Sequence, residues 1–398
     1  MYNSFSGFPK DLIDALKRCD ELCDVDQLKF YYELYDPKTG GFYYSISSRD
    51  TEGMTPFAEG TSFTLEALNY GGMEIPIWER EKVSSWIIGH QDEADGFFYE
   101  DLWGKTTSGS RLNRDMIYSL DILDRCGASP KYALPTERIK NNDTNSTIPQ
   151  YLSSETAMLE YLDSLDWSYD EIWRTGQRLA MASALIYAAG YKDLLRNYLL
   201  TKINPQTGLF ADGLGWMNTN GSMKVSRFFD VDFPYPNIEL AIDSVIKIFE
   251  NSPPPSVATH IWNPFVFLDR TIKSQGKRSD DVRKLLIEKG AKIVNIAVDR
   301  ALKLKRADGG FATYPDRAAH RQQGYLYGLG LPNESDLDGT LIAGPRLRQS
   351  ILSAFGVEDS GGHYKEYEKE FWKKCRNKPP IVKKFPKPNA SMKAEDKP

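Results

Sequence analysis

Three acidic residues stand where helical patterns begin and could supply acid and base to one reaction. Glu59, Asp232 and Asp338 each lie at or just before the first residue of such a pattern. Paired carboxyl groups suit glycoside hydrolysis, because one protonates the leaving oxygen while the other activates water. A carboxylate at a helix N-terminus can instead cap free N–H groups. The sequence favours Asp338 and Glu59 as the catalytic pair, with Asp232 third, and leaves open which is the acid.

Polar and aromatic residues in the loops next to these helices are the candidates for substrate binding. An arginine there would recognise an anionic substrate, and a tryptophan would stack on a sugar ring. For each of them the alternative is a packing role or an ordinary surface position. The candidates are Arg49, Asp101, Arg111, Trp216 and the two acidic residues that precede proposed catalytic ones, Asp230 and Asp336.

The loop from Tyr314 to Arg321 holds the densest polar cluster in the chain and offers a second chemistry. In β-elimination on a uronic acid, Arg317 or His320 would neutralise the carboxylate while Tyr314 or His320 takes and returns a proton. Asp316 joins the same cluster as a candidate for substrate binding. A solvated loop with a satisfied histidine would look the same, so a lyase or epimerase is an alternative to a hydrolase.

Four Gly-aromatic turns recur along the chain, and each follows a helical stretch. They are Thr39-Gly40-Gly41-Phe42, Asp95-Gly96-Phe97-Phe98, Thr207-Gly208-Leu209-Phe210 and Asp308-Gly309-Gly310-Phe311. Glu59-Gly60-Thr61 follows the first turn and Asp338-Gly339-Thr340 the last. A repeated unit of helix, tight turn, loop and helix is typical of repeat architectures, and closure into a ring would aim the same loop of each unit into one cavity.

The apolar periodicity predicts an all-α protein. Helical spacing is common, whereas almost no run alternates for long enough to form a central strand. Irregular repeats and long loops favour a closed (α/α) toroid, similar to an α/α6 barrel, over an open solenoid. We expect a single domain over residues 1–372 and a disordered basic Lys/Pro-rich tail over 373–398. The predicted helices are 10–23, 25–35, 59–70, 77–90, 112–126, 154–165, 169–189, 194–203, 237–249, 262–274, 279–305 and 339–355.

Composition narrows the class of protein. The 398 residues carry a net charge of −5, with 41% hydrophobic and 26% charged residues, which is ordinary for a soluble globular protein. No basic stripe suggests nucleic-acid binding, and neither a signal peptide nor a membrane-spanning run is evident, so we expect a cytoplasmic protein. The four cysteines lack the spacing of a zinc site. We expect no cofactor or metal, and a small-molecule or oligosaccharide substrate.

Two segments resemble a known repeat. The segment 86–98, which ends Asp95-Gly96-Phe97-Phe98, and the piece Ala307-Asp308-Gly309-Gly310-Phe311 resemble the Gln-…-Asp-Gly-Gly-aromatic repeat of the squalene cyclase and prenyltransferase superfamily. Many polysaccharide lyases and glycoside hydrolases share the toroid of that superfamily. The resemblance therefore implies a fold more strongly than a reaction.

Departures from the family motifs leave several functions open. Class II terpene cyclases carry Asp-x-Asp-Asp, whereas Asp230-Val231-Asp232-Phe233 and Asp336-Leu337-Asp338-Gly339 both lack the last Asp. Prenyltransferase β-subunits use a zinc held by Asp, Cys and His, and no cysteine is near either Asp pair in sequence. The favoured function is a glycoside hydrolase acting on an oligosaccharide. The alternatives are a lyase or epimerase, a terpenoid cyclase-like enzyme with an apolar aromatic cavity, and a non-catalytic binding scaffold.

Overall fold

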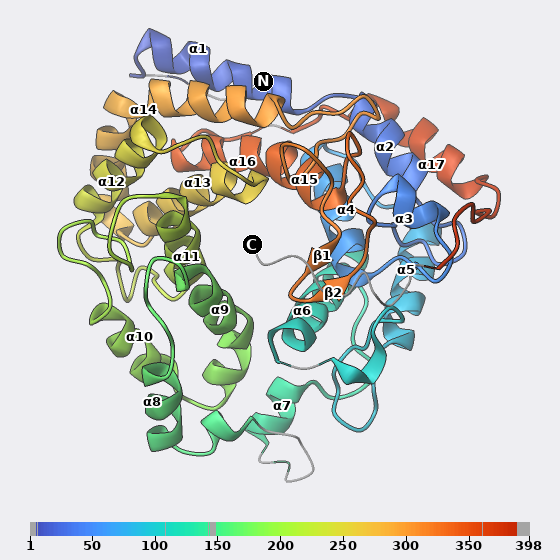
Figure 1. Cartoon of the computed structure of the whole chain (residues 1–398), viewed down its shortest axis with the longest axis horizontal. Coiled ribbons are helices and arrows are strands. Elements are labelled where there is room, and N and C mark those ends of the chain that lie inside the picture. Colours follow the sequence, from blue (N-terminus) through green and yellow to red (C-terminus); the bar gives the residue numbers. More distant parts are fainter. Residues whose placement is uncertain are drawn as a thin grey trace. The chain divides into compact units, whose positions relative to one another are not determined.

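The computed structural model describes residues 5, 7–107, 109–141, 143, 149–359 and 361–387. These residues are predominantly helical, and their only strands, β1 (Arg321–Gln322) and β2 (Tyr325–Leu326), pair in one short antiparallel hairpin (Figure 1). The prediction of an all-α fold is therefore confirmed. Among the same residues, no helix is both long and apolar enough to cross a membrane.

The chain divides into two compact units, each assembled from segments that are distant in sequence. Unit 2 contains residues 20–132, 301–348 and 361–398. Its central helix is α4 (Ala58–Tyr70), whose residues from Ala58 to Leu68 are all buried, and which packs against α6 and α15. The other helices are α2 (Asp26–Leu34), α3 (Ile46–Asp50), α5 (Ile77–Gly89), α6 (Gly109–Cys126), α15 (Leu337–Ala343) and α17 (Glu368–Arg376), with short 3-10 turns η1 (Cys19–Leu22), η2 (Gly104–Thr106) and η5 (Lys365–Tyr367).

Unit 1 contains residues 1–19, 133–300 and 349–360. Within it, α11 packs against α9 and α13. Gly176 of α9 and Gly221 of α11 let these two helices approach closely, because a Cβ on Gly176 would lie 2.9 Å from the Gly221 carbonyl oxygen. Its elements are α1 (Lys10–Arg18), α7 (Pro135–Lys140), η3 (Gln150–Leu152), α8 (Glu155–Asp163), α9 (Ile172–Ala188), α10 (Lys192–Leu200), α11 (Trp216–Ser226), α12 (Ile238–Asn251), α13 (Ala258–Lys273) and η4 (Gly276–Arg278), with most of α14 (Ser279–Leu302) and α16 (Pro345–Ala354).

The four predicted turns share one backbone geometry. Gly40, Gly96, Gly208 and Gly309 have φ values of 78°, 78°, 69° and 99°, a region in which residues with a Cβ are strained. In three of the turns the next aromatic residue donates its backbone N–H to a hydroxyl on the following helix. The pairs are Phe42 with Thr61 (3.0 Å), Phe210 with Ser222 (3.2 Å) and Phe311 with Thr340 (3.0 Å). The repeat is therefore present in both units.

Among the described residues, four helices lie outside the predicted ranges: α3, α7, α11 and α17. α11 has the sequence WMNTNGSMKVS, in which Asn, Thr, Gly and Ser are weak helix formers, yet it is almost entirely buried. Ser45 caps α3 by accepting a bond from the Ser48 amide. The predicted helix 279–305 is present as α14, whereas the predicted helix 339–355 divides at Gly344.

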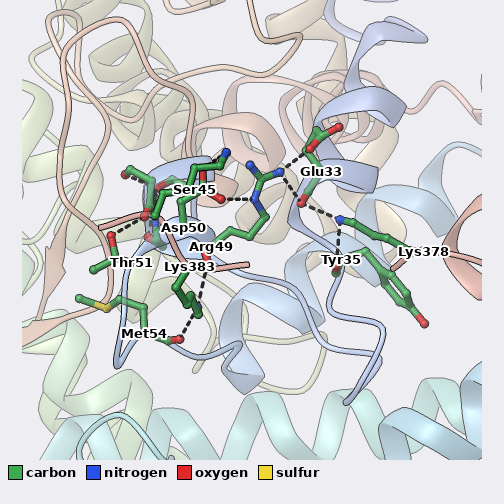
Figure 2. A network of polar contacts seen from close by, with 12 residues as sticks. Glu33, Tyr35, Ser45, Arg49, Asp50, Thr51, Met54, Lys378 and Lys383 are labelled. Atoms are coloured by element: carbon green, nitrogen blue, oxygen red, sulfur yellow. Dashed lines mark hydrogen bonds and ion pairs between the residues drawn. The ribbon is translucent and has the colours of Figure 1, made fainter. Parts of the chain in front are cut away.

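The described part of the basic tail makes specific contacts with unit 2, in contrast to the expected disorder from Lys373 onward. α17 continues to Arg376, and the following residues 378–387, here called the C-terminal strap, cross the region of α3 (Figure 2). Lys378 Nζ donates to the carbonyls of Glu33 (2.8 Å) and Tyr35 (2.9 Å), and so caps the C-terminus of α2. Lys383 Nζ donates to the Arg49 carbonyl at 2.8 Å. Residues 388–398 lie outside the described part of the chain.

Candidate active site around Asp338

Asp336 and Asp338 begin α15 and have different surroundings. Asp336 is the N-cap residue of α15. Its carboxyl group accepts hydrogen bonds from Gly339 N (2.6 Å), Thr313 N (2.8 Å), Thr313 Oγ1 (2.7 Å) and Ala319 N (2.8 Å). Four N–H and O–H donors are what a buried carboxylate needs. Burial raises the pKa of Asp336, and the bonds from Gly339, Thr313 and Ala319 oppose that rise.

The Asp338 carboxyl group is buried and favours its neutral form. Its residue is 5% exposed, and the Tyr44 hydroxyl lies 3.2 Å from Oδ2. Burial raises the pKa of Asp338 to about 7, the negative charge of Glu59 adds to this, and Arg114 opposes it. A carboxyl group with such a pKa holds a proton close to neutral pH and can give it up there.

Glu59, in the first turn of α4, has the opposite protonation state. It accepts bonds at 2.8 Å from Arg111 Nη1 and from Arg114 Nε on Oε2, and Arg114 Nη2 bonds Oε1. Although burial favours the neutral form, Arg114 and Arg111 lower the pKa of Glu59 to about 2. Arg111 also binds Asp115, one turn further along α6, at 2.8 Å. Glu59 is therefore a permanent anion whose two oxygens are both occupied by guanidinium groups.

Aromatic rings surround these polar groups. The ring of Tyr327 lies 4.1 Å from that of Tyr44 and is stacked on Phe57 at 5.4 Å, measured between centroids. The ring centroid of Trp103 lies 5.3 Å from that of Tyr325 and 5.1 Å from the Arg111 guanidinium carbon. The Trp103 indole N–H donates to Asp115 at 2.8 Å. Tyr44, whose hydroxyl lies against Asp338 Oδ2, therefore belongs to a cluster of packed aromatic rings.

α3 bonds the segment that precedes α15. Ser48 Oγ donates to the Tyr327 carbonyl at 2.9 Å, and the Ser47 amide donates to Glu334 Oε1 at 2.6 Å. The Leu337 amide in turn donates to the Tyr44 carbonyl at 3.0 Å. Sequence reasoning did not single out Tyr44, Tyr327 or Asp115; the i, i+4 spacing from Arg111 to Asp115 on one helix was the one local signal available.

The third carboxylate of the predicted set needs a correction. The bonds from Phe42, Phe210 and Phe311 align Glu59-Gly60-Thr61 and Asp338-Gly339-Thr340 with Asn220-Gly221-Ser222, not with Asp232. Asp232 is an exposed residue of unit 1, whereas Asn220 is buried in α11 and accepts a bond from Asn263. The equivalent position was missed because α11 lacks a helical apolar pattern.

Several predicted substrate-binding residues have structural partners instead. Arg49 donates to Asp50 at 2.8 Å and pairs with Glu33 (Figure 2). Trp216 is packed in unit 1, with its indole N–H on the Pro253 carbonyl at 2.8 Å. Asp230 pairs with Arg196 in the same unit, and Asp101 is exposed near His90 Nε2 at 3.5 Å. Two predicted substrate-binding residues contact the residues around Asp338: Arg111 bonds Glu59, and Asp336 accepts from Tyr44.

The predicted lyase residues lie on the loop before α15. The Arg317 guanidinium lies 5.0 Å from the Tyr314 ring and bonds Asp316 at 3.0 Å, and the Asp316 side chain is 71% exposed. His320 is partly buried, and its carbonyl accepts the Tyr327 amide at 2.9 Å. Among the described residues, no group of three His, Cys, Asp or Glu side chains is arranged to hold a metal ion.

Comparisons with known proteins give weak matches of one kind. No protein-family model matches the chain, and no curated protein matches its sequence. Structures of two variants of the type II terpene cyclase MstE from Scytonema, in complex with the substrate geranylgeranyl dihydroxybenzoate, are similar with TM-scores of 0.43 and 0.42 at 13% identity. A third variant, without ligand, has a TM-score of 0.41 at 12% identity. Each match covers 86% of this chain and 99% of the other. At this level the similarity assigns neither a family nor an activity.

Proposed function

We propose that this protein is an enzyme that cyclises a linear isoprenoid, and that Asp338 starts the reaction by protonating a carbon–carbon double bond. The observation that carries the proposal is the burial of the Asp338 carboxyl group at 3.2 Å from the hydroxyl of Tyr44, whose ring packs on that of Tyr327; burial raises the pKa of Asp338 to about 7. Protonation of an alkene needs an acid kept from water, next to groups that stabilise a carbocation. Aromatic faces supply that stabilisation through their quadrupoles.

The reaction would leave the composition of the substrate unchanged. The proton of Asp338 adds to one carbon of the double bond, and the π electrons form the new C–H bond. The cation left on the other carbon is attacked by the next double bond, which closes a ring. Loss of a proton from carbon ends the sequence, and Asp338 regains a proton from solvent. We assign to Phe57 and Trp103, with the two tyrosines, the stabilisation of the cation, because their rings pack together beside Asp338.

Glycoside hydrolysis, the favoured expectation from sequence, has less support. It requires a second carboxyl group that is able to activate water. Glu59 is the charged partner nearest to that role, but Arg111 and Arg114 occupy its oxygens and lower its pKa to about 2. We assign to Glu59 the role of a fixed negative charge that favours the protonated form of Asp338.

The departure from the Asp-x-Asp-Asp motif has a packing explanation that agrees with the proposal. Gly339 occupies the position of the last Asp. A Cβ at this position would lie 2.3 Å from the carbonyl carbon of Ala312, closer than any side chain tolerates. The missing carboxylate is therefore excluded by the close approach of residues 311–313, while Asp338 keeps its burial.

The test is a product assay in deuterated water. The purified protein is incubated with squalene, with linear prenyl chains of increasing length, and with a prenylated aromatic such as geranylgeranyl dihydroxybenzoate. We expect a cyclic isomer that carries one deuterium from the first protonation. Asp338→Asn should lower turnover by roughly 10²–10⁴-fold, whereas Asp232→Asn, the same change at an exposed site, should leave it unaltered. Hydrolysis of oligosaccharides with no conversion of any isoprenoid would overturn the proposal.

A further inference from the structure

The C-terminal strap holds the end of the short helix α3. Phe385 pairs with Thr51 in a parallel bridge. The Phe385 amide donates to the Asp50 carbonyl at 3.0 Å, and the Phe385 carbonyl accepts the Glu52 amide at 2.9 Å. Lys384 adds a second amide bond to the Asp50 carbonyl at 2.6 Å, and its Nζ lies 2.7 Å from Asp50 Oδ2. The strap thus continues the backbone hydrogen bonding of α3 beyond its last residue.

Lys383 reaches the same end of α3 from the strap (Figure 2). Its Nζ donates to the carbonyls of Arg49 at 2.8 Å and Met54 at 3.0 Å, and lies 4.3 Å from the centroid of the Tyr43 ring. Arg49 belongs to the last turn of α3, whose carbonyls have no partner within the helix. Because α3 has only five residues, it is too short to be stable alone and depends on contacts such as these.

α3 in turn holds the segment that leads into α15. The Ser47 amide donates to Glu334 Oε1 at 2.6 Å, and the Ser47 hydroxyl donates to Glu334 Oε2 at 2.7 Å. The Ser48 hydroxyl donates to the Tyr327 carbonyl at 2.9 Å. Glu334 is 9% exposed and lies four residues before Asp338. One series of contacts therefore runs from the strap through α3 to the segment that precedes the helix of Asp338.

We infer that Lys383 is a positioning residue through which the C-terminal strap fixes α3 and, through α3, the segment 327–334 next to the proposed site. The inference rests on the proposed function for its effect on turnover, but not for the contact between strap and helix. Without Lys383 the Arg49 carbonyl loses this donor, and the five residues of α3 are expected to fray. A frayed α3 releases Glu334 from Ser47, and the start of α15 then moves. A shift of about 1 Å at a reacting group is enough to lower a rate roughly 10²-fold.

The coupling is tested by hydrogen–deuterium exchange with mass spectrometry on the full chain, without substrate. In Lys383→Met we expect the amides of residues 45–54 to exchange roughly 5–100-fold faster, the equivalent of two ordinary hydrogen bonds. The distinguishing result is a second acceleration, at residues 327–337, because a contact that only anchors the strap would not move that segment. Residues 77–89 of α5 should keep the wild-type rate, which excludes a general loss of stability.

Two further variants complete the experiment. Lys369→Met, the same substitution at an exposed position of α17, should leave every rate unchanged. Ser47→Ala removes one of the two bonds to Glu334 and should by itself accelerate exchange at residues 327–337. If the coupling runs through α3, Ser47→Ala and Lys383→Met together should accelerate that segment by less than the product of their separate factors.

Turnover separates this inference from the proposed function. In an active protein Lys383→Met should lower kcat on the isoprenoid roughly tenfold, and Lys369→Met should not. Acceleration confined to residues 45–54, equal acceleration of residues 77–89, or an unaltered kcat in an active protein would overturn the inference. If wild type converts no isoprenoid but residues 327–337 exchange faster in Lys383→Met, the proposed function fails and the coupling stands.

Discussion

Glu59 and Asp338 occupy equivalent positions in two repeats, and their surroundings shift the pKa values of the two carboxyl groups in opposite directions. Each lies two residues before a threonine, Thr61 or Thr340, whose hydroxyl accepts a backbone N–H from the aromatic residue of the preceding turn at 3.0 Å. The two arginines of α6 fix the first as an anion, and burial keeps the second neutral. One repeated motif thus supplies both a fixed charge and a stored proton to unit 2.

The first prediction concerns the stability of the protein against pH. Burial and the charge of Glu59 raise the pKa of Asp338 from 3.8 to about 7, so between these values the folded chain keeps a proton that the unfolded chain has released. This proton contributes fully to the free energy of unfolding below about pH 4. The contribution, on the order of 4 kcal/mol, is lost as the pH rises to 7. Asp338→Asn should lack this loss. The free energy of unfolding in urea, followed against pH, measures this loss, and Asp232→Asn is the matched control. Parallel curves of this free energy for wild type and Asp338→Asn would show that Asp338 is ionised.

A second prediction concerns the arginines that hold Glu59. Removal of Arg114 leaves a buried carboxylate with half of its partners, which typically costs about 3–5 kcal/mol of folding free energy. We expect this loss for Arg114→Met in chemical denaturation. The surface pair of Arg278 and Glu239, with 66% and 48% of the side chains exposed, provides the comparison. Arg278→Met should cost less than about 1 kcal/mol, and equal losses for the two variants would mean that the buried pair has no special weight.

A third prediction tests the close packing at the start of α15. Gly339→Ala would place a Cβ 2.3 Å from the Ala312 carbonyl carbon, so helix and loop must separate. The expected cost is roughly 1–3 kcal/mol, together with a loss of turnover because Asp338 moves with the helix. Gly89→Ala is the control: no atom outside its own helix lies within 4 Å of the added Cβ. It should be neutral or stabilising, and an unchanged melting temperature for Gly339→Ala would contradict the packing described here.

The C-terminal strap provides the fourth prediction. Lys378 caps α2 through backbone carbonyls, so Lys378→Met should lower the free energy of unfolding by roughly 1–3 kcal/mol and expose residues 378–387 to proteases. Lys369→Met, at an exposed position of α17, should do neither. Proteolysis followed by mass spectrometry locates the cut. Equal cleavage of the two variants would show that the strap is held by other contacts.

Local chemistry determined much of the fold. The four turn glycines are readable in the sequence because each needs a backbone conformation that other residues avoid, and the positive φ values agree. Most helices follow from apolar spacing for the same local reason. α11 does not, because burial between α9 and α13 stabilises a helix that its polar residues would not form alone.

The candidate site, like the fold, has one part that the sequence predicts and another that depends on the tertiary structure. The sequence by itself singled out Glu59 and Asp338 as candidates, since Glu59-Gly60-Thr61 and Asp338-Gly339-Thr340 follow the first and last turns, and it singled out Arg111 as an arginine beside a predicted helix. It could not tell the charged carboxyl group from the neutral one, because Glu-Gly-Thr and Asp-Gly-Thr look alike locally. That choice depends on partners brought from far along the chain: Arg111 and Arg114 against Glu59, and Tyr44 against Asp338. Protonation is set by burial and by neighbouring charges, and only tertiary structure supplies both.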